Sequence, residues 1–232
     1  MTTGFVDRMD AGEALAVRLA AYRDRADALV LGLPRGGVPV ASVVADHLHL
    51  PLDVLVVRKL GAPGQPEFAI GAIASGGVIV MNPDVEEMFE GTQALQVAVA
   101  RESRELKRRE ALYRNDRLPL DIHGRTVILV DDGAATGSTM IAAVKAVQRM
   151  GARRVVVAVP VASAEARASF QAVADEVACV LQPLALSSVA EWYRNFEQVD
   201  DAEVSLILSR AHLLASRRLS HSEQARPNAN GA

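Results

Sequence analysis

The sequence predicts an α/β fold, in which a mainly parallel sheet is flanked by helices. Short segments that are apolar throughout alternate along the chain with longer segments of helical periodicity, as expected when strands are buried on both faces of a sheet. Half of the 232 residues are hydrophobic, which is ample material for a buried core. Aromatic residues make up only 4% of the chain, so this core must consist mainly of Val, Leu, Ile and Ala.

In the first half of the chain, strand and helix signals alternate and are separated by Gly and Pro. Residues 59–68 contain two Gly and two Pro and therefore predict a loop. The pair Gly76-Gly77 lies between two apolar runs and predicts a hairpin. The expected elements are helices at 10–24 and 38–48, strands at 28–33 and 52–57, and hairpin strands at 69–75 and 78–81.

The second half of the chain repeats the alternation of strand and helix. Residues 92–113 predict a long helix, whose alternating acids and bases indicate a solvated face rather than a nucleic-acid site. The further expected elements are strands at 126–130, 155–161 and 176–181, and helices at 138–150 (ended by Gly151), 164–174 and 202–216. We expect one domain over residues 1–216 and a disordered polar tail over residues 217–232.

Charge and cysteine content exclude several classes of protein. The formal net charge of −3 gives no global attraction to nucleic acid or anionic lipid, so neither is an expected partner. The single cysteine, Cys179, excludes an internal disulfide and lies in an apolar run, where a small core residue is expected. The N-terminus has no secretion signal, and no stretch approaches the ~18 unbroken apolar residues of a membrane span. The sequence therefore predicts a cytoplasmic protein.

The segment that follows the strand at 126–130 carries the strongest functional signal. The strand delivers the adjacent acids Asp131 and Asp132 to its carboxyl end, and a run of small residues leads from them into a helix. Backbone N–H groups and the helix dipole at such a position favour an anion, and Thr136, Ser138 and Thr139 add hydroxyl donors. The pattern suits a phosphate beside a polyol. The alternative is an ordinary N-capped helix after a tight turn, which leaves the two neighbouring acids unexplained.

This segment resembles the motif of type I phosphoribosyltransferases that binds 5-phosphoribosyl 1-diphosphate (PRPP). That motif is a hydrophobic strand, two acids, two small residues and a Thr-Gly-x-Thr turn, and each part is present here. The resemblance implies that Asp131 and Asp132 contact the ribose hydroxyls and hold Mg²⁺ through water or those hydroxyls. It also implies that the turn binds the 5′-phosphate. We call this turn the phosphate turn; it consists of Ala135, Thr136, Gly137, Ser138 and Thr139.

The loop after the first strand is similar to the pyrophosphate loop of the same family. There a short turn, often with a cis or strained peptide, presents backbone N–H groups to the diphosphate. Here Arg35 adds a delocalised charge that can stabilise the departing pyrophosphate, and Gly36 and Gly37 remove steric bulk. Alone, the Arg-Gly-Gly sequence is more typical of a simple turn, but the stronger motif elsewhere in the chain favours the PRPP-binding interpretation.

The loop expected after the second strand begins with two cations, and in the family this region carries a mobile loop or its base. Lys59 is the candidate for neutralising the pyrophosphate as it leaves, with Arg58 second. Glu67 is a weaker candidate for orienting a cation or the acceptor. The alternative is a surface loop with ordinary charges.

The acceptor in type I enzymes is recognised by a small variable segment called the hood. Here the candidate hood is residues 184–199, joined to the N-terminal residues 5–8. Trp192 and Tyr193 could stack a planar base, or they could close the sheet as a hydrophobic plug, which is the favoured alternative for Trp192. Purine-salvage members carry an Asp where this chain has Ala135, which weakens an assignment to hypoxanthine or guanine.

The resemblance covers most of residues 28–182 and extends to a bacterial subgroup of phosphoribosyltransferases whose acceptor is undefined. It implies a Mg²⁺-dependent enzyme that moves ribose 5-phosphate from PRPP to a small nitrogenous acceptor and releases pyrophosphate. It also implies a homodimer, because dimers are common in the family. Two alternatives remain open, namely a non-catalytic PRPP-binding regulator and a phosphatase or receiver-like domain whose Asp131 accepts a phosphoryl group. No DNA-binding pattern supports a regulator, and the Thr-Gly-Ser-Thr turn disfavours a receiver.

Overall fold

The structure is a computed structural model that describes residues 4–224 apart from 63, 116 and 120, without the side chains of 66, 67 and 216–224. Five strands form a parallel sheet in the order β2-β1-β6-β7-β8, which confirms the predicted fold class. These strands are β1 (Ala28–Gly32), β2 (Leu52–Val54), β6 (Thr126–Val130), β7 (Arg154–Val161) and β8 (Glu176–Leu181).

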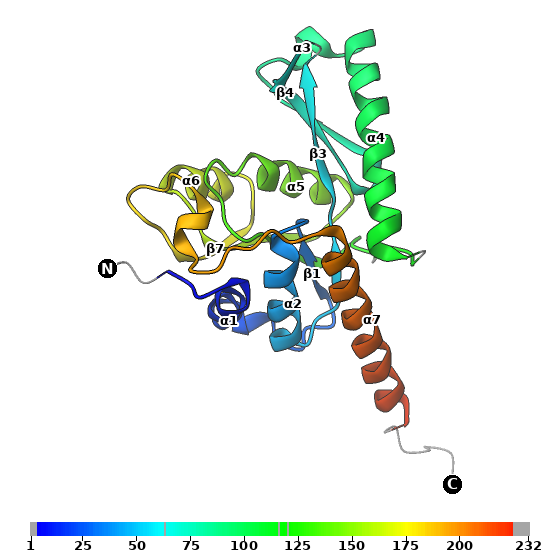
Figure 1. Cartoon of the computed structure of the whole chain (residues 1–232). Coiled ribbons are helices and arrows are strands. Elements are labelled where there is room, and N and C mark those ends of the chain that lie inside the picture. Colours follow the sequence, from blue (N-terminus) through cyan, green and yellow to red (C-terminus); the bar gives the residue numbers. More distant parts are fainter. Residues whose placement is uncertain (1–3, 63, 116, 120, 225–232) are drawn as a thin grey trace.

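Four helices cover the two faces of the parallel sheet (Figure 1). They are α1 (Arg8–Arg18) and α2 (Gly37–Leu48) on one face, and α5 (Ser138–Arg149) and α6 (Ala164–Gln171) on the other. Along β1, Leu29 and Leu31 pack with α5 and α6, whereas Ala28 and Val30 pack with α1 and α2. Burial on both faces is the reason that the strands read as unbroken apolar runs.

A second, antiparallel sheet in the order β3-β4-β5 projects from this body beside the long helix α4 (Figure 1). Its strands are β3 (Val57–Ala62), β4 (Gln65–Ala74) and β5 (Val78–Met81), and α4 spans Gln93–Arg114. The β4–β5 hairpin confirms the prediction from Gly76-Gly77, with Ala74 opposite Val78 and a 3₁₀ turn, η2 (Ser75–Gly77), between the strands.

The prediction of a loop over residues 59–68 is wrong, because these residues form most of the β3–β4 hairpin. Glycine and proline suggested a loop, but here they lie at irregular positions of the hairpin, where the register shifts around Gly61. Leu60 and Ile70 are fully buried and belong to a core cluster with α4, and this packing overrides the local signal. The strand predicted at 52–57 likewise divides, since β2 ends at Val54 and β3 starts at Val57.

Small apolar side chains join the antiparallel sheet to α5, and we call this contact the inter-sheet seam. Its buried members are Ala74, Val80 and Ala146, with Val57 and Val78 packed against them. Because α5 also covers the parallel sheet, this helix lies between the two sheets. The seam therefore sets the position of the antiparallel sheet relative to the start of α5.

The remaining elements follow the predicted order with shifted ends. The N-terminal helix ends at Arg18 and is followed by η1 (Ala20–Tyr22). The other short helices are α3 (Glu86–Phe89) and η3 (Val189–Trp192). The last helix, α7 (Asp201–Gln224), continues past Ser216 into the segment that was expected to form a tail, and residues 225–232 lie outside the described residues. None of the helices in the described part of the chain is both long and apolar enough to span a bilayer.

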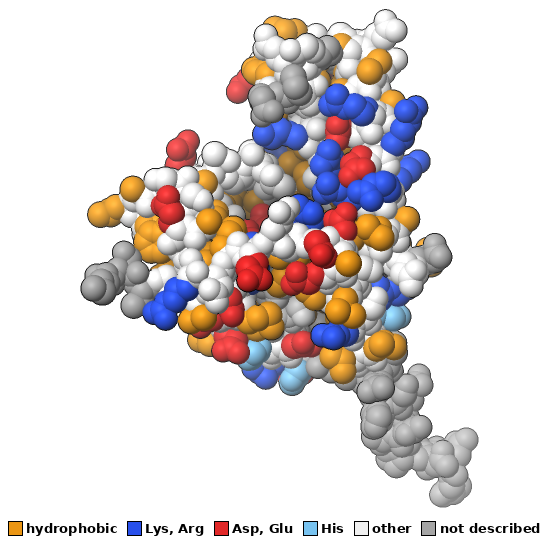
Figure 2. Space-filling view, viewed as in Figure 1, with side chains coloured by type: hydrophobic (Ala, Val, Ile, Leu, Met, Phe, Trp, Pro, Cys, Tyr) orange, Lys and Arg blue, Asp and Glu red, His pale blue; other side chains and the backbone are white. Residues whose placement is uncertain are grey.

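The charged face of α4 carries interleaved acids and bases, as predicted (Figure 2). Arg108 and Arg109 both pair with Glu105 on this helix. Buried Glu102 accepts hydrogen bonds from Arg58 of β3 at 2.8 and 3.0 Å. The pair of Arg58 and Glu102 attaches the helix to the antiparallel sheet, and the pairs with Glu105 compensate charges along the helix itself.

Candidate active site

The loops that follow β1 and β6 lie side by side at the carboxyl edge of the parallel sheet. The two strands are neighbours, and their last paired residues are Gly32 and Val130. A Cβ on Gly36 would overlap the carboxylate of Asp132, and one on Gly37 would lie 2.8 Å from the Cα of Asp131. Both glycines are therefore required by this close approach. The peptide bond between Pro34 and Arg35 is cis, and Arg35 is half-buried.

The phosphate turn leads directly into α5, whose N-cap is Gly137 with a φ of 72°. No side chain caps this helix by a hydrogen bond, so the alternative of an ordinary Ser- or Thr-capped helix does not describe the turn. The backbone is fixed from behind, because Ser163 Oγ donates to the carbonyl of Ala135 at 2.8 Å. Thr136, Ser138 and Thr139 are exposed beside the first N–H groups of the helix. This arrangement is suited to an anion.

Burial and mutual repulsion oppose the ionisation of the two acids. Burial, with the neighbouring charge of Asp132, raises the pKa of the Asp131 carboxyl well above its usual range. Burial also raises the pKa of Asp132, and the guanidinium of Arg8 opposes that rise. A bound cation or positively polarised hydroxyls would relieve this cost, so the pair is poised to bind a ligand of that kind.

A raised pKa at Asp131 has a consequence for folding. The native state retains a proton that the unfolded chain releases near its ordinary pKa of about 3.9, so the free energy of unfolding falls as the pH rises from there to the raised pKa. Asp131→Asn removes this titration. We expect its melting temperature to rise relative to the wild type as the pH increases from about 4 to 8. Thermal unfolding at several pH values tests this, with Asp84→Asn in an exposed loop as the control; parallel curves for Asp131→Asn and the wild type would contradict it.

A cavity of about 530 Å³ opens between the antiparallel sheet and the start of α5. Its polar lining includes Thr136, Ser138 and Thr139 of the phosphate turn, Lys59 from β3 and Lys145 from α5. Among the residues whose side chains the structure describes, no Asp or Glu lines this cavity and neither lysine has an ion pair. The chain contains only three lysines, so the presence of two of them here is a marked concentration of flexible positive charge. The cavity has the size of a small-molecule site and the charge to receive an anion.

The model of the phosphoribosyl transferase domain family matches residues 7–191, which include both loops and the phosphate turn. The chain belongs to this family. A Mycobacterium tuberculosis (strain H37Rv) protein named "Putative phosphoribosyl transferase" is 49% identical over 209 residues, which are 90% of this chain and 47% of that protein. The chain thus spans about half the length of this relative.

Two further proteins are similar to this chain over different shares of its length. The crystal structure of TT1426 from Thermus thermophilus has a TM-score of 0.80 and 45% identity, and covers 89% of this chain and 98% of that one. The adenine phosphoribosyltransferase of Mycobacterium avium (strain 104) is 29% identical over 139 residues, 60% of this chain and 58% of that protein. The fold is therefore shared with TT1426 over nearly the whole length of that chain.

The resemblance to phosphoribosyltransferases indicated Lys59, Arg58 and Glu67 as candidate site residues. The structure places Lys59 and Arg58 in different surroundings. Lys59 is exposed and lines the cavity together with the phosphate turn. Arg58 is engaged with Glu102 and serves to hold α4 against β3. The side chain of Glu67 lies outside the described residues, so its role stays a prediction.

The candidate hood is joined to the N-terminus, as expected. The amide of Phe5 donates to the carbonyl of Trp192 at 2.8 Å, and that of Arg194 donates to the carbonyl of Phe5 at 3.0 Å. Tyr193 is buried between the rings of Phe5 and Phe196, with centroid distances of 5.5 and 4.9 Å. Trp192 packs partly buried against the same cluster. This packing favours the plug for both aromatic residues, and their acceptor contact stays a prediction.

Sequence reasoning missed two residues at the site, Arg8 and Lys145. Arg8 was included only as part of the N-terminal segment near the hood, yet it forms an ion pair with Asp132 at 2.9 Å. Its separation from Asp132 along the chain left no local signal. Lys145 follows Ser138 by seven positions, so the two residues share one face of α5. That spacing could have placed Lys145 beneath the phosphate turn.

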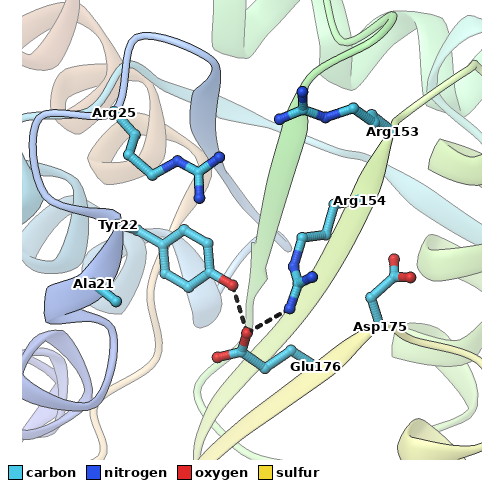
Figure 3. Close-up of a pocket in the computed structure, with 7 residues that line it drawn as sticks. All are labelled: Ala21, Tyr22, Arg25, Arg153, Arg154, Asp175 and Glu176. Atoms are coloured by element: carbon cyan, nitrogen blue, oxygen red, sulfur yellow. Dashed lines mark hydrogen bonds and ion pairs between the residues drawn. The ribbon is translucent and has the colours of Figure 1, made fainter.

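A second cavity, of about 510 Å³, lies at the opposite, amino-terminal edge of the sheet, beside the starts of β7 and β8 (Figure 3). The arginines that line it are matched with carboxylates. Arg154 and the hydroxyl of Tyr22 both bind Glu176, and Arg25 and Arg153 both pair with Asp27. This charge compensation distinguishes it from the lysine-lined cavity at the phosphate turn, where no described Asp or Glu side chain pairs with the ammonium groups.

Proposed function

We propose that the chain is a PRPP-dependent phosphoribosyltransferase that moves ribose 5-phosphate to a small nitrogenous acceptor and releases pyrophosphate. One observation carries this proposal: the acid pair, the Arg-Gly-Gly loop and the phosphate turn meet at one edge of the sheet, beside a cavity that contains Lys59. These groups match the four parts of PRPP that need binding, which are the diol, the diphosphate, the 5′-phosphate and the charge of the leaving group.

The proposed reaction requires electrostatic stabilisation by the protein and little covalent catalysis. The bond between C1′ of the ribose and the diphosphate oxygen breaks, and the pair of electrons leaves with pyrophosphate. Arg35, the backbone of Gly36 and Gly37, and Lys59 would stabilise the negative charge that grows there. Asp131 and Asp132 would hold the ribose. The acceptor nitrogen then forms a bond to C1′ and loses its proton, and an acceptor that is already anionic needs no base.

The residues at this site fit Mg²⁺ only in company with a substrate. Among the described residues, no cluster of three or more His, Cys, Asp or Glu side chains could hold a metal ion. Mg²⁺ commonly binds through one or two carboxylates together with substrate phosphates and water. Asp131 and Asp132 would supply such carboxylates and would contact the ion through water or through the ribose hydroxyls. The ion would neutralise charge on the diphosphate.

Wild-type protein with Mg-PRPP provides the direct test. We expect calorimetry to detect PRPP binding that depends on Mg²⁺. We also expect pyrophosphate release when one member of a panel of purines, pyrimidines and small amines is added. Binding without release from any acceptor would favour the alternative, a non-catalytic PRPP-binding regulator. Failure to bind PRPP at all would remove both.

Substitution of Lys59 should slow turnover much more than it weakens the binding of PRPP. We expect Lys59→Met to slow pyrophosphate release by about a hundredfold, which is typical of losing one charge-stabilising group in a transition state. The affinity for PRPP should change much less, because the exposed ammonium would act mainly on charge that develops later. Lys107→Met, at an exposed position of α4, is the matched control. Equal losses of affinity and rate in Lys59→Met would contradict the assigned role.

A further inference from the structure

The guanidinium of Arg8, at the start of α1, is held on three sides. Its Nε and Nη2 both lie 2.9 Å from Oδ2 of Asp132, and its Nη1 donates to the carbonyl of Glu197 at 2.7 Å. The plane also lies 3.9 Å from the centre of the Phe196 ring. The Arg8 side chain is only 11% exposed, and α1 begins at a firm cap in which Asp7 accepts from the amides of Met9 and Asp10. Arg8 therefore has little freedom to move.

These contacts determine which carboxylate oxygens of the acid pair remain available. Oδ2 of Asp132 is bound by Arg8, and Oδ1 of Asp131 accepts the backbone N–H of Asp132 at 2.9 Å. Neither Arg8 nor this backbone N–H occupies the other two oxygens, Oδ2 of Asp131 and Oδ1 of Asp132. The two carboxyl groups lie close enough to share a hydrogen bond with each other. A pair of neighbouring hydroxyls or a hydrated cation could take the place of this shared proton and contact one oxygen of each acid.

Arg8 is also the cation that offsets the burial of Asp132. The groups that act on this carboxylate are Asp131 beside it, Arg8 from α1 and Tyr193 from the hood, whose hydroxyl donates to the backbone carbonyl of Asp132 at 2.5 Å. The β1 loop contributes Gly36 at this contact, which has no side chain. Without Arg8, burial and the repulsion of Asp131 would act on Asp132 without opposition from a cation.

We propose that Arg8 is a positioning residue for the ribose site, which fixes Asp132 so that the two acids present one oxygen each to the diol of PRPP or to its hydrated cation. This inference rests on the proposed function. It adds a residue from outside both PRPP-binding loops, which belongs to the N-terminal helix and is anchored to the hood by Glu197 and Phe196.

The test is calorimetric titration of Mg-PRPP into wild type, Arg8→Gln and Arg8→Lys under the same conditions. Arg8→Gln removes the contact of two guanidinium nitrogens with one oxygen of Asp132. We therefore expect about tenfold weaker binding than wild type, which corresponds to the loss of one charge-assisted hydrogen bond. Arg8→Lys keeps the charge but loses the two-pronged contact, so its affinity should be intermediate. Arg18→Gln, on the exposed side of the same helix, is the control.

Each outcome decides the proposal. PRPP binding by wild type, together with a loss of affinity in Arg8→Gln and partial rescue by Arg8→Lys, supports it. Equal affinity in wild type and Arg8→Gln overturns it. Equal losses of affinity in Arg8→Gln and Arg8→Lys also overturn it, since this would mark a merely structural role. If wild type itself does not bind PRPP, the proposed function fails instead, so the two failures are distinguishable. Thermal unfolding of each variant confirms that binding is measured on folded protein.

Discussion

The double variant Asp131→Asn with Asp132→Asn is expected to lose measurable affinity for Mg-PRPP while remaining folded. Asparagine keeps the size of aspartate but removes two negative charges, and the amide is a poor substitute where a carboxylate accepts hydrogen bonds from hydroxyls or from the water of a cation. Charge-assisted hydrogen bonds contribute about 1.5–3 kcal/mol each. Losing two of them predicts an affinity reduced by at least about a hundredfold.

Folding should survive this change because the native state does not depend on both charges. Burial raises the pKa of both acids, so ionising them opposes folding rather than supporting it. The side-chain oxygen of an asparagine at 132 can still accept from Arg8. Calorimetry with Mg-PRPP and thermal unfolding together measure the expected separation of binding from stability.

The chain offers a matched control in a second pair of adjacent aspartates, Asp200 and Asp201, at the start of α7. Asp200 accepts from the amide of Glu203, and Asp201 accepts from the hydroxyl of Tyr113. Replacing this pair with asparagines changes the net charge by the same amount, and asparagine can take over the capping role. PRPP affinity should be unchanged. If the variant at 131 and 132 bound PRPP as well as this control, the ribose site would have to lie elsewhere.

Gly137→Ala should have the second large effect, on stability and PRPP binding together. The residue has a left-handed φ of 72°, and an added Cβ would lie 2.5 Å from Cε1 of the fully buried Phe170. The backbone conformation costs a non-glycine residue about 1–2 kcal/mol, and overpacking a closed core costs about 1–3 kcal/mol more. We therefore expect a loss of about 2–5 kcal/mol in the free energy of unfolding, measured by urea denaturation.

Gly124→Ala separates the two contributions. Gly124 has a φ of 70°, and no heavy atom lies within 4 Å of the place where its Cβ would be. Gly124→Ala should therefore lose only the contribution of the backbone conformation to the free energy of unfolding, about 1–2 kcal/mol, and should bind PRPP normally. In Gly137→Ala the phosphate turn must shift to make room, so PRPP affinity should fall as well. Equal losses of stability in the two variants would show that the contact with Phe170 is unimportant.

The two loops proposed to bind PRPP could be located from the sequence because each is a local feature. The acids and the phosphate turn follow one strand within ten residues, and Arg35, Gly36 and Gly37 follow another. Adjacent loops at one sheet edge are then a general property of parallel sheets. The order of the parallel strands was not predicted, but their apolar character was enough to indicate burial on both faces.

Contacts between residues that are far apart in the chain could not be predicted from the sequence. Arg8 and Asp132 are 124 positions apart, and nothing near Arg8 marks it as a partner of an acid. The β3–β4 hairpin was missed because its glycines and prolines are local signals for a loop, whereas Leu60 and Ile70 are held in strands by packing against α4. The same packing moved Lys59 from an expected loop onto a strand.

Because Lys59 stands on the antiparallel sheet and the phosphate turn stands on α5, the gap between them is set by the inter-sheet seam. The buried side chains of that seam are as small as Ala74 and Ala146, so they act as a spacer of nearly minimal thickness. A bulkier residue in place of Ala74 or Ala146 would act as a wedge and would move the ammonium of Lys59 away from the phosphate turn. The distance between these two groups is thus set in part by residues that are not among the described lining of the cavity.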